Sequence, residues 1–314
     1  MTLSVGIDVG GTKIAAGVVA EDGTLVTSSR SESPAEDPKA IAQEIAALVA
    51  GFQTQHEIAC VGVAAAGWIN LERTEVMFAP NLAWRDEPLQ ELIAGQVGLP
   101  TVIENDANAA AWGEFRFGSG QGARSLLMAT IGTGIGGGIV LGGQVFRGGF
   151  GVGAEIGHIR MVPQGRLCAC GRNGCWEAYG SGTGLTAIAQ ELAAADPASA
   201  KILLTLAEDD PEAITGPMVS AAAEGGDPVA DQAFAEVARW IGEGLGSLAA
   251  VLDPDIIVIG GGVSESAALD LDAIRTAFEN SESGFGHRPA PRIERATLGN
   301  DAGMIGAADL ARLG

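Results

Sequence analysis

The chain has 314 residues, of which 47% are hydrophobic and 5% aromatic, and 39 acidic residues against 18 basic ones give a formal charge of −21. This composition is typical of an α/β protein with a sizeable core, and the acidic balance argues against nucleic acid or an anionic membrane as a partner. No apolar run is long enough to span a bilayer and no secretory signal is evident, so we expect a cytoplasmic protein with reduced cysteines.

The N-terminal residues predict an antiparallel meander. Residues 3–29 read as a strand, a glycine turn, a second strand, an Asp-Gly turn and a third strand. A strand at residues 14–19, rather than a helix, follows Gly10 and Gly11. This order excludes a dinucleotide-binding fingerprint, and the spacing of a Walker loop is absent.

The turn between the first two strands has the groups that a phosphate site needs. Gly10 and Gly11 offer backbone amides, Thr12 a hydroxyl and Lys13 an ammonium group, while Asp8 offers a carboxylate to a hydrated magnesium ion. A plain tight turn is the alternative interpretation. Clustered glycine, 47 residues in all, favours turns at which the backbone approaches phosphate.

The next segment predicts an α/β arrangement. Residues 38–52 place five apolar side chains on one helical face, and residues 58–65 form a continuous apolar run typical of a buried strand. Cys60 lies inside that run, so we interpret it as a small core residue.

A group of polar residues follows a second short strand. Asn81 lies in a loop rich in turn residues, and residues 100–104 predict a strand that ends at Asn105 and Asp106. A helix is predicted from Ala109 to Phe115. Polar side chains at such a strand end are where α/β folds place their chemistry, although Asp106 is also a candidate helix N-cap.

The plan of the first meander returns later in the chain. Residues 126–146 again read as strand, glycine turn, strand, glycine pair and strand, with Gly132-Thr133-Gly134 at the first turn. A third cluster, Gly260-Gly261-Gly262, follows the buried strand predicted at residues 256–259. The repeat predicts two related lobes, and three glycine turns at strand ends are suited to one nucleotide.

The segment from 155 to 177 predicts a metal site. It brings together His158, Cys168, Cys170 and Cys175 within a stretch rich in Gly, Pro and Arg that we expect to be loop. One imidazole and three thiolates supply the ligands of a closed tetrahedral zinc site, and three thiols cannot all pair as disulfides. Free or redox-active thiols are the alternative.

Two carboxylates flank this metal segment. Glu155 precedes the histidine by three residues, and Glu177 follows the last cysteine by two. Because the predicted metal shell is already full, these carboxylates are available to accept hydrogen bonds from adjacent hydroxyls of a polyhydroxyl ligand. Two solvated surface glutamates are the alternative.

Helices dominate the remainder of the chain. Residues 183–195 and 228–252 have helical apolar periodicity, and the apolar positions of the longer one are interpreted as core. A last helix is predicted from Ala302 to Arg312, with small residues that allow close packing. The acidic run at residues 208–210 is interpreted as a solvated loop.

Taken together, these motifs resemble those of the ROK family of sugar kinases, and most closely its bacterial ATP-dependent glucokinases. The resemblance rests on the two glycine turns, the Asn-Asp pair, the Glu-x-x-His motif and the cysteine signature, and it extends over most of the chain. The last two motifs are the most specific.

The resemblance implies the actin-like ATPase fold, also called ribonuclease-H-like, in which two lobes with duplicated α/β cores surround a cleft. We expect a small lobe at 1–110 with 298–314, and a large lobe at 111–297 that contains the zinc-binding segment.

The resemblance also assigns roles to individual residues. Asp106 is the expected general base, and Mg²⁺ is expected near Asp8. The residues expected to bind the sugar are Asn81, Asn105, Asp106, Glu155, His158 and Glu177. The residues expected to bind ATP and its phosphates are Asp8, Gly10, Gly11, Thr12, Lys13, Thr133, Gly134, Gly260, Gly261 and Gly262. The zinc is expected to be structural, bound by His158, Cys168, Cys170 and Cys175.

The expected reaction is the transfer of a phosphoryl group from ATP to the 6-hydroxyl of glucose. Kinases acting on N-acetylmannosamine, N-acetylglucosamine, mannose or fructose have the same motifs and remain alternatives, as do polyphosphate as donor and a non-catalytic sugar sensor or binding protein. The third glycine cluster favours ATP as the donor. The resemblance implies a homodimer or homotetramer.

Overall fold

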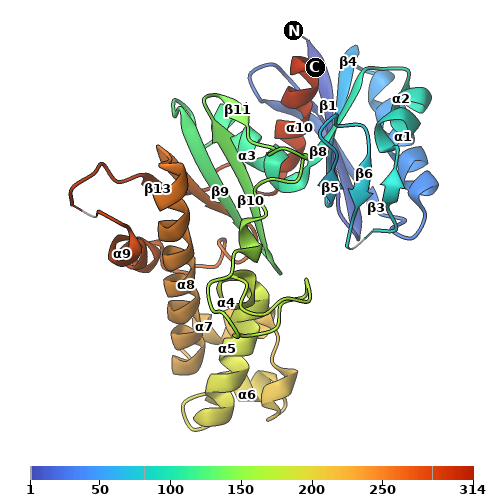
Figure 1. Cartoon of the computed structure of the whole chain (residues 1–314). Coiled ribbons are helices and arrows are strands. Elements are labelled where there is room, and N and C mark those ends of the chain that lie inside the picture. Colours follow the sequence, from blue (N-terminus) through green and yellow to red (C-terminus); the bar gives the residue numbers. More distant parts are fainter. Residues whose placement is uncertain (1, 81, 285) are drawn as a thin grey trace. The chain divides into compact units, whose positions relative to one another are not determined.

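The computed structural model describes residues 2–80, 82–284 and 286–314, and Figure 1 shows its helices and strands along the chain. The chain divides into two compact units. Unit 1 comprises Met1–Met128, Gly137–Ala154 and Ala296–Gly314, and unit 2 comprises Ala129–Gly136 and Glu155–Arg295. The lobe boundaries expected from the sequence, 1–110 with 298–314 and 111–297, stay a prediction.

Unit 1 is built on a five-stranded sheet of order β3-β2-β1-β4-β8, in which β1, β4 and β8 are parallel and β2 and β3 complete an antiparallel meander. A small antiparallel sheet has the order β5-β6-β7. The elements are β1 (Leu3–Val9), β2 (Lys13–Val19), β3 (Leu25–Glu32), α1 (Pro38–Gln53), β4 (Ile58–Ala65), β5 (Trp68–Ile69), β6 (Val76–Phe78), β7 (Arg85–Glu87), α2 (Leu89–Val97), β8 (Thr101–Asn105), α3 (Asp106–Phe117), β11 (Gln144–Val145), η3 (Gly299–Asp301) and α10 (Ala302–Leu313).

A second five-stranded sheet has the order β11-β10-β9-β12-β13. Its strands β9 (Ser125–Ile131) and β10 (Ile135–Leu141) each contribute residues to both units. The remaining elements belong to unit 2: η1 (Ile156–His158), α4 (Glu177–Gly180), α5 (Gly182–Ala195), α6 (Lys201–Leu206), η2 (Pro211–Ala213), α7 (Gly216–Glu224), α8 (Pro228–Leu252), β12 (Ile256–Gly260), α9 (Leu271–Ser281) and β13 (Arg292–Arg295).

Helix starts in both units follow from local capping chemistry. Asp37 precedes Pro38 and accepts hydrogen bonds from two amides in the first turn of α1. Asp227, which is 1% exposed, caps α8 in the same way and also accepts from the amides of Ile202 and Leu203 in α6. One buried carboxylate therefore fixes the starts of two helices.

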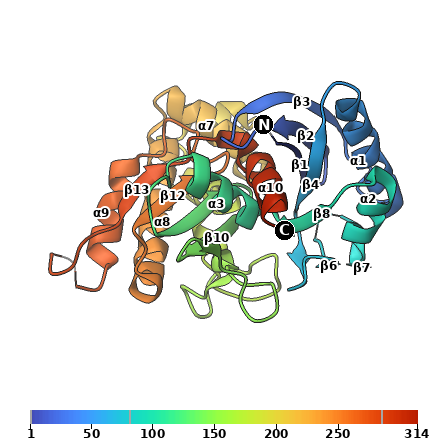
Figure 2. The same ribbon diagram turned by 90° about the horizontal axis from the view of Figure 1, so that it is seen from above.

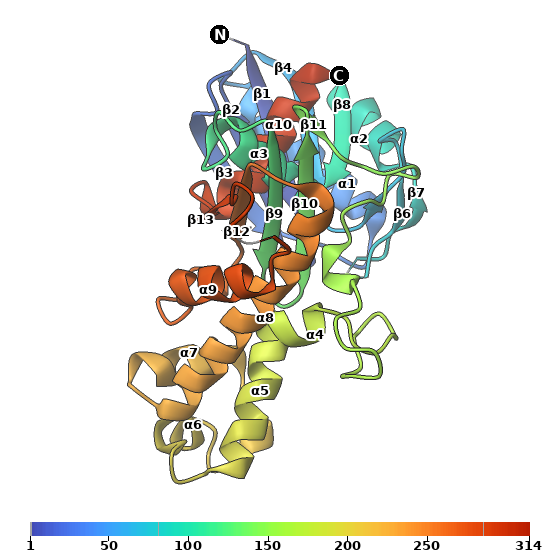
Figure 3. The ribbon, with the colours of Figure 1, turned by 60° about the vertical axis from the view of Figure 1, so that its left-hand side comes forward.

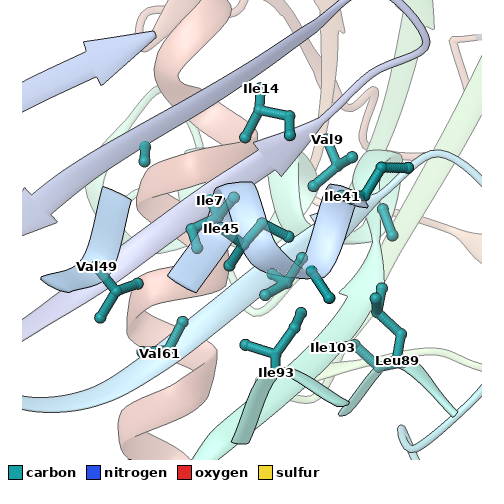
Figure 4. Packing of buried hydrophobic residues seen from close by; sticks show 14 of the residues in the cluster. Ile7, Val9, Ile14, Ile41, Ile45, Val49, Val61, Leu89, Ile93 and Ile103 are labelled. Carbon is teal, nitrogen blue, oxygen red and sulfur yellow. The ribbon is translucent and has the colours of Figure 1, made fainter. Parts of the chain in front are cut away.

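The main sheet of unit 1 has two different faces because side chains alternate along each strand. On one face, Val5, Ile7 and Val9 of β1 join the apolar residues of β2, β4 and β8 in a core that α1 and α2 cover. Figure 4 shows Ile41, Ile45 and Val49 of α1 and Ile93 of α2 within this packing. The opposite face is in contact with α10, and Figure 2 shows α10 and α3 on the side of the sheet away from α1 and α2.

The face toward α10 is formed by very small residues. A Cβ atom on Gly6 would lie 1.9 Å from the Met304 carbonyl oxygen, and one on Gly62 would lie 1.9 Å from the Ala307 carbonyl oxygen. On the helix itself, a Cβ on Gly306 would lie 1.8 Å from the Ala109 carbonyl oxygen of α3. The backbone of α10 is therefore in direct contact with the sheet and with α3, as its predicted small residues indicate.

Unit 2 is organised around the 25-residue helix α8, which packs against α5, α7 and α9 (Figure 3). Val237, Ile241 and Leu245 of α8 are buried, which confirms the predicted core face. Trp176 is fully buried, and a Cβ on Gly244 would lie 2.1 Å from its ring. The indole Nε1 donates to the Trp240 carbonyl oxygen at 2.7 Å.

Most of the predicted elements are confirmed to within a few residues, and Cys60 is buried in β4 as expected, with its Sγ 3.3 Å from the Ser4 hydroxyl. The acidic run at 208–210 is exposed. The β5-β6-β7 sheet and the helices α2, α6, α7 and α9 were not predicted from the sequence. In the part of the chain that the structure describes, no helix meets the length and hydropathy that a membrane span requires.

We expect Gly62→Ala to destabilise unit 1. Its methyl group would be forced against the Ala307 carbonyl of α10, and backbone cannot move aside as a side chain can. Overpacking of this kind costs about 1–3 kcal/mol or more.

Gly95→Ala is the matched control, because this exposed α2 position has nothing within 4 Å of the added Cβ. That change should raise stability by about 0.5–1 kcal/mol. Urea unfolding of both variants tests this, and equal stability of Gly62→Ala and the wild type would contradict it.

Candidate active site

Two acidic residues lie near the carboxyl ends of parallel strands in unit 1. Asp8 is the penultimate residue of β1, and Asp106 directly follows β8. Where β1 pairs with β4, Asp8 lies opposite Ala64. Where β4 pairs with β8, Asn105 lies opposite Ala65, the next residue of β4. Asp106, the residue after Asn105, therefore starts two residues beyond the level of Asp8 at the same sheet edge, which is where α/β folds place binding residues.

Asn105 holds the start of α3 and orients Asp106. Its side-chain oxygen accepts from the amides of Ala107 and Asn108 at 3.0 and 3.1 Å, so Asn105, not Asp106, is the N-cap. Its amide nitrogen donates to the Gly67 carbonyl at 3.1 Å and to Asp106 Oδ1 at 3.0 Å. Both lone pairs and both N–H groups of Asn105 are thus engaged within the protein.

Burial alters the acidity of both carboxyl groups. Burial raises the pKa of Asp106 above its ordinary value, against the opposing effect of the hydrogen bonds that it accepts. The pKa of Asp8 is raised to about 7, first by burial and second by the negative charge of Asp106. An acid with a raised pKa is a stronger proton acceptor when ionised, and a cation beside Asp8 would favour its charged form.

The first glycine turn of unit 1 is closed by its own backbone. The Gly10 amide donates to the Lys13 carbonyl at 3.0 Å, and the Ser33 amide donates to the Thr12 carbonyl at 3.0 Å. The side chains of Thr12 and Lys13 are exposed, whereas Gly11 is half-buried. The Gly10 amide is thus used inside the turn, while the hydroxyl and ammonium groups face solvent.

The second and third glycine turns meet within unit 2. The Val263 amide donates to the Ile131 carbonyl at 2.9 Å, and Gly261 has a φ of +86° and no room for a Cβ beside the Ile131 backbone. The Thr133 carbonyl accepts from the Thr183 hydroxyl at 2.8 Å. The turn Gly132–Gly134 therefore lies against both the Gly260–Gly262 turn and the start of α5.

The four predicted metal ligands converge in unit 2. One ligand atom from each of His158, Cys168, Cys170 and Cys175 lies within 4.8 Å of all the others. His158 Nδ1 is 3.8 Å from Cys168 Sγ, and the Sγ atoms of Cys170 and Cys175 are 3.6 Å apart. In a tetrahedral site with zinc–sulfur bonds of about 2.3 Å, neighbouring sulfurs lie about 3.8 Å apart, so this cluster can hold a zinc ion.

The two flanking glutamates lie beside the cluster. Glu155 Oε2 is 3.9 Å from His158 Nε2, the ring nitrogen opposite the one that faces the cysteines. Glu177 accepts from the Ile135 amide at 3.0 Å through Oε2 and from the Cys168 thiol at 3.4 Å through Oε1. A Cβ on Gly134 would lie 2.1 Å from Glu177 Oε2, so the second glycine turn and the metal segment are in direct contact.

Several residues that organise this region were not predicted from the sequence. Trp176 anchors the end of the metal segment to α8. Its position in the sequence, between the predicted ligand Cys175 and Glu177, was the available signal for such a role. Gly182, the first residue of α5, donates to the Gly132 carbonyl at 2.8 Å, and the alternating small residues around it were the available signal. Glu104, 1% exposed at the end of β8, had no signal beyond its place beside Asn105.

The structure thus brings the predicted site residues together in two groups. In unit 1, Asp8–Lys13 accompany Asn105 and Asp106. In unit 2, the second and third glycine turns accompany the metal segment. Asn81, a predicted sugar contact, lies outside the described residues.

Comparison with known proteins places this arrangement in a family. The family model of the ROK family matches residues 4–313. A glucokinase of Streptomyces coelicolor is 50% identical over 312 residues, covering 99% of this chain and 98% of its own. An N-acetylmannosamine kinase of Yersinia pseudotuberculosis is 31% identical over 307 residues, covering 98% of this chain and 97% of its own.

A solved structure supports the same conclusion. The crystal structure of a ROK family glucokinase from Streptomyces griseus in complex with glucose and AMPPNP superimposes with a TM-score of 0.87 at 49% identity, covering 99% of this chain and 100% of the other. This likeness confirms the predicted actin-like ATPase fold. With a family match over nearly its whole length and the expected motifs in the expected elements, the chain belongs to the ROK family.

Proposed function

We propose that the chain is an ATP-dependent glucokinase that transfers the γ-phosphoryl group of ATP to the 6-hydroxyl of glucose. The observation that carries the proposal is the setting of Asp106, a carboxyl group with a raised pKa that Asn105 holds at a strand end. The 50% and 49% identical Streptomyces proteins are glucokinases, and the latter is a complex with glucose and AMPPNP, which favours glucose and ATP as the substrates.

In the proposed mechanism, Asp106 accepts the proton of the glucose 6-hydroxyl as that oxygen attacks the γ-phosphorus. The bond between the γ-phosphorus and the bridging oxygen of ATP breaks, and ADP leaves with that oxygen. Phosphoryl transfer demands little covalent chemistry from the protein, so alignment and charge stabilisation supply most of the rate. Asn105 contributes by fixing Asp106 Oδ1, since its own hydrogen-bonding capacity is already engaged.

We assign the phosphates of ATP to the glycine turns. A Mg²⁺ ion bound with ATP would neutralise phosphate charge and favour the ionised form of Asp8, whose pKa is otherwise about 7. Because the Gly10 amide is engaged within its turn, Gly10 is proposed to permit close approach of phosphate rather than to donate to it. The remaining proposed contacts with ATP are Gly11, Thr12, Lys13, Thr133, Gly134, Gly260, Gly261 and Gly262.

We assign the other hydroxyls of glucose to Glu155, His158 and Glu177, with Asn81 as a further proposed contact. A sugar hydroxyl would reach Asn105 only in place of one of the partners that its side chain now has. The cluster of His158 with the three cysteines is proposed to hold a structural zinc ion, since four N and S ligands leave no position open for a catalytic water. The Glu155 carboxylate, 3.9 Å from His158 Nε2, would favour a proton on that nitrogen and so leave Nδ1 for the metal. The role of the metal is therefore to fix the positions of the sugar-binding carboxylates.

The same site chemistry suits other hexoses, and the 31% identical N-acetylmannosamine kinase keeps that sugar as the second candidate. The resemblance to the family further leads us to propose a cytoplasmic homodimer or homotetramer.

Glucose should be the preferred acceptor. We expect purified protein with Mg-ATP to release ADP fastest with glucose in a panel that also contains mannose, fructose, N-acetylglucosamine and N-acetylmannosamine, with a reaction lacking sugar as control. Preference for another sugar would reassign the specificity, and the absence of sugar-dependent release would contradict the proposed activity.

Asp106→Asn should lower kcat by ~10²–10⁴-fold, because a positioned base contributes about that much, and leave glucose binding nearly unchanged. In the wild type the rate should fall as the pH is lowered through the raised pKa of Asp106, since the protonated carboxyl cannot accept the proton. The residual rate of the variant should lack this acid limb. Steady-state kinetics from pH 5 to 9 test both expectations, and a variant with wild-type turnover would remove Asp106 from the mechanism.

A further inference from the structure

We propose that Glu104 and Arg147 are positioning residues that hold the Asn105–Asp106 junction in its catalytic geometry; the inference rests on the proposed function. Glu104 is the residue before Asn105 and is 1% exposed. Its Oε1 accepts from the Asn105 amide at 2.9 Å and from Asn108 Nδ2 at 3.2 Å. One buried carboxylate therefore contacts residues on both sides of Asp106.

Arg147 joins this carboxylate to a distant part of unit 1. The residue is 7% exposed and follows β11, and its Nε lies 3.2 Å from Glu104 Oε1 and 3.0 Å from Oε2. Its other nitrogens donate to the Leu71 carbonyl at 2.7 Å and the Asn70 carbonyl at 2.9 Å. The guanidinium group thus ties the end of β8 to the turn after β5.

The same turn is held from two other directions. Arg73, at a φ of +60°, places its Nε 3.0 Å from Glu104 Oε2. Gly151 has a φ of +87°, and a Cβ there would lie 2.4 Å from the Ile69 carbonyl oxygen. The turn also adjoins Gly67, whose carbonyl accepts from Asn105. The side chain that orients Asp106 therefore rests on a segment that Arg147 and Arg73 fix.

The ion pairs of Glu104 with Arg147 and Arg73 oppose separation of these side chains. A buried carboxylate in contact with two guanidinium groups is costly to separate, because removal of one partner leaves an uncompensated buried charge. The cluster links residues about 40 positions apart in the chain and reaches Asp106 only through Asn105 and the backbone. We infer that its role is to keep the Asp106 carboxylate in line, since a displacement of about 1 Å at a reacting group can cost ~10²-fold in rate.

The test compares Glu104→Gln and Arg147→Met with Glu114→Gln. Glu114 is the matched control, since it is also fully buried in unit 1, ten residues further along, and accepts from the amides of Ser119 and Leu298 away from Asp106. For each protein, kcat and KM for glucose are measured, together with amide hydrogen exchange at Ala107 and Asn108, whose N–H groups bind Asn105.

We expect both test variants to lower kcat by ~10–10²-fold, with a much smaller change in KM, and to speed exchange at Ala107 and Asn108. Glu114→Gln should lose thermal stability but keep wild-type kcat and wild-type exchange at these two amides. Arg147→Lys keeps the positive charge but not the forked contacts of the guanidinium group. Its kcat and its exchange rates at Ala107 and Asn108 should therefore lie between those of the wild type and those of Arg147→Met. If the other variants do not fold, these measurements on Arg147→Lys test the inference.

Wild-type kcat and exchange in Glu104→Gln and Arg147→Met, or an equal loss of kcat in Glu114→Gln, would overturn the inference. If the wild type phosphorylates no sugar, the proposed function fails, and the exchange at Ala107 and Asn108 still decides whether the Glu104–Arg147 pair holds this junction.

Discussion

The organisation of unit 2 depends on the contacts of one carboxylate, Glu177. Its Oε2 accepts from the Ile135 amide and its Oε1 lies 3.4 Å from Cys168 Sγ, so it joins the metal segment to the strand that follows the second glycine turn. Gly134 must lack a side chain for this contact to form. Trp176, buried against α8, fixes the same corner from the other side. A metal ion in the cluster would thereby influence the proposed sugar contacts and the proposed phosphate turn together, without any bond to either substrate.

Unit 1 is built on a different constraint, the direct contact between the backbone of α10 and the sheet. Glycine at positions 6 and 62 lets the helix approach until carbonyl oxygens occupy the space of side chains. Asp8 lies on this same face, with its Oδ2 3.5 Å from where a Cβ on Gly303 would be. The close packing excludes water from one side of Asp8, and this burial is the larger cause of its raised pKa, ahead of the negative charge of Asp106. Packing and site chemistry are therefore linked through the same helix.

The elements that the sequence predicts well are those with strong local signals. Helix α8 is predicted from Pro228 to Leu252 and observed there because an aspartate cap, a proline start and an apolar period all agree. The metal ligands are equally local, since their spacing specifies the chemistry. The short strands β5, β6 and β7 were missed because their two or three residues carry no period of their own. The contacts of Glu104 with Arg147 and of Trp176 with Gly244 join distant segments, and no local pattern predicts such pairs.

Glucose binding by the metal-stripped protein tests the central claim most directly, namely that a metal ion in the cluster fixes the carboxylates proposed to bind the sugar. The measurement compares Cys175→Ser with Cys60→Ser, a buried cysteine of unit 1 outside the cluster, using zinc per chain and the Kd for glucose by calorimetry. The account predicts that Cys175→Ser and the chelated wild type lose zinc and bind glucose at least ~10-fold more weakly, while Cys60→Ser keeps one zinc per chain and wild-type affinity. Full glucose affinity in a folded, zinc-free chain would contradict it.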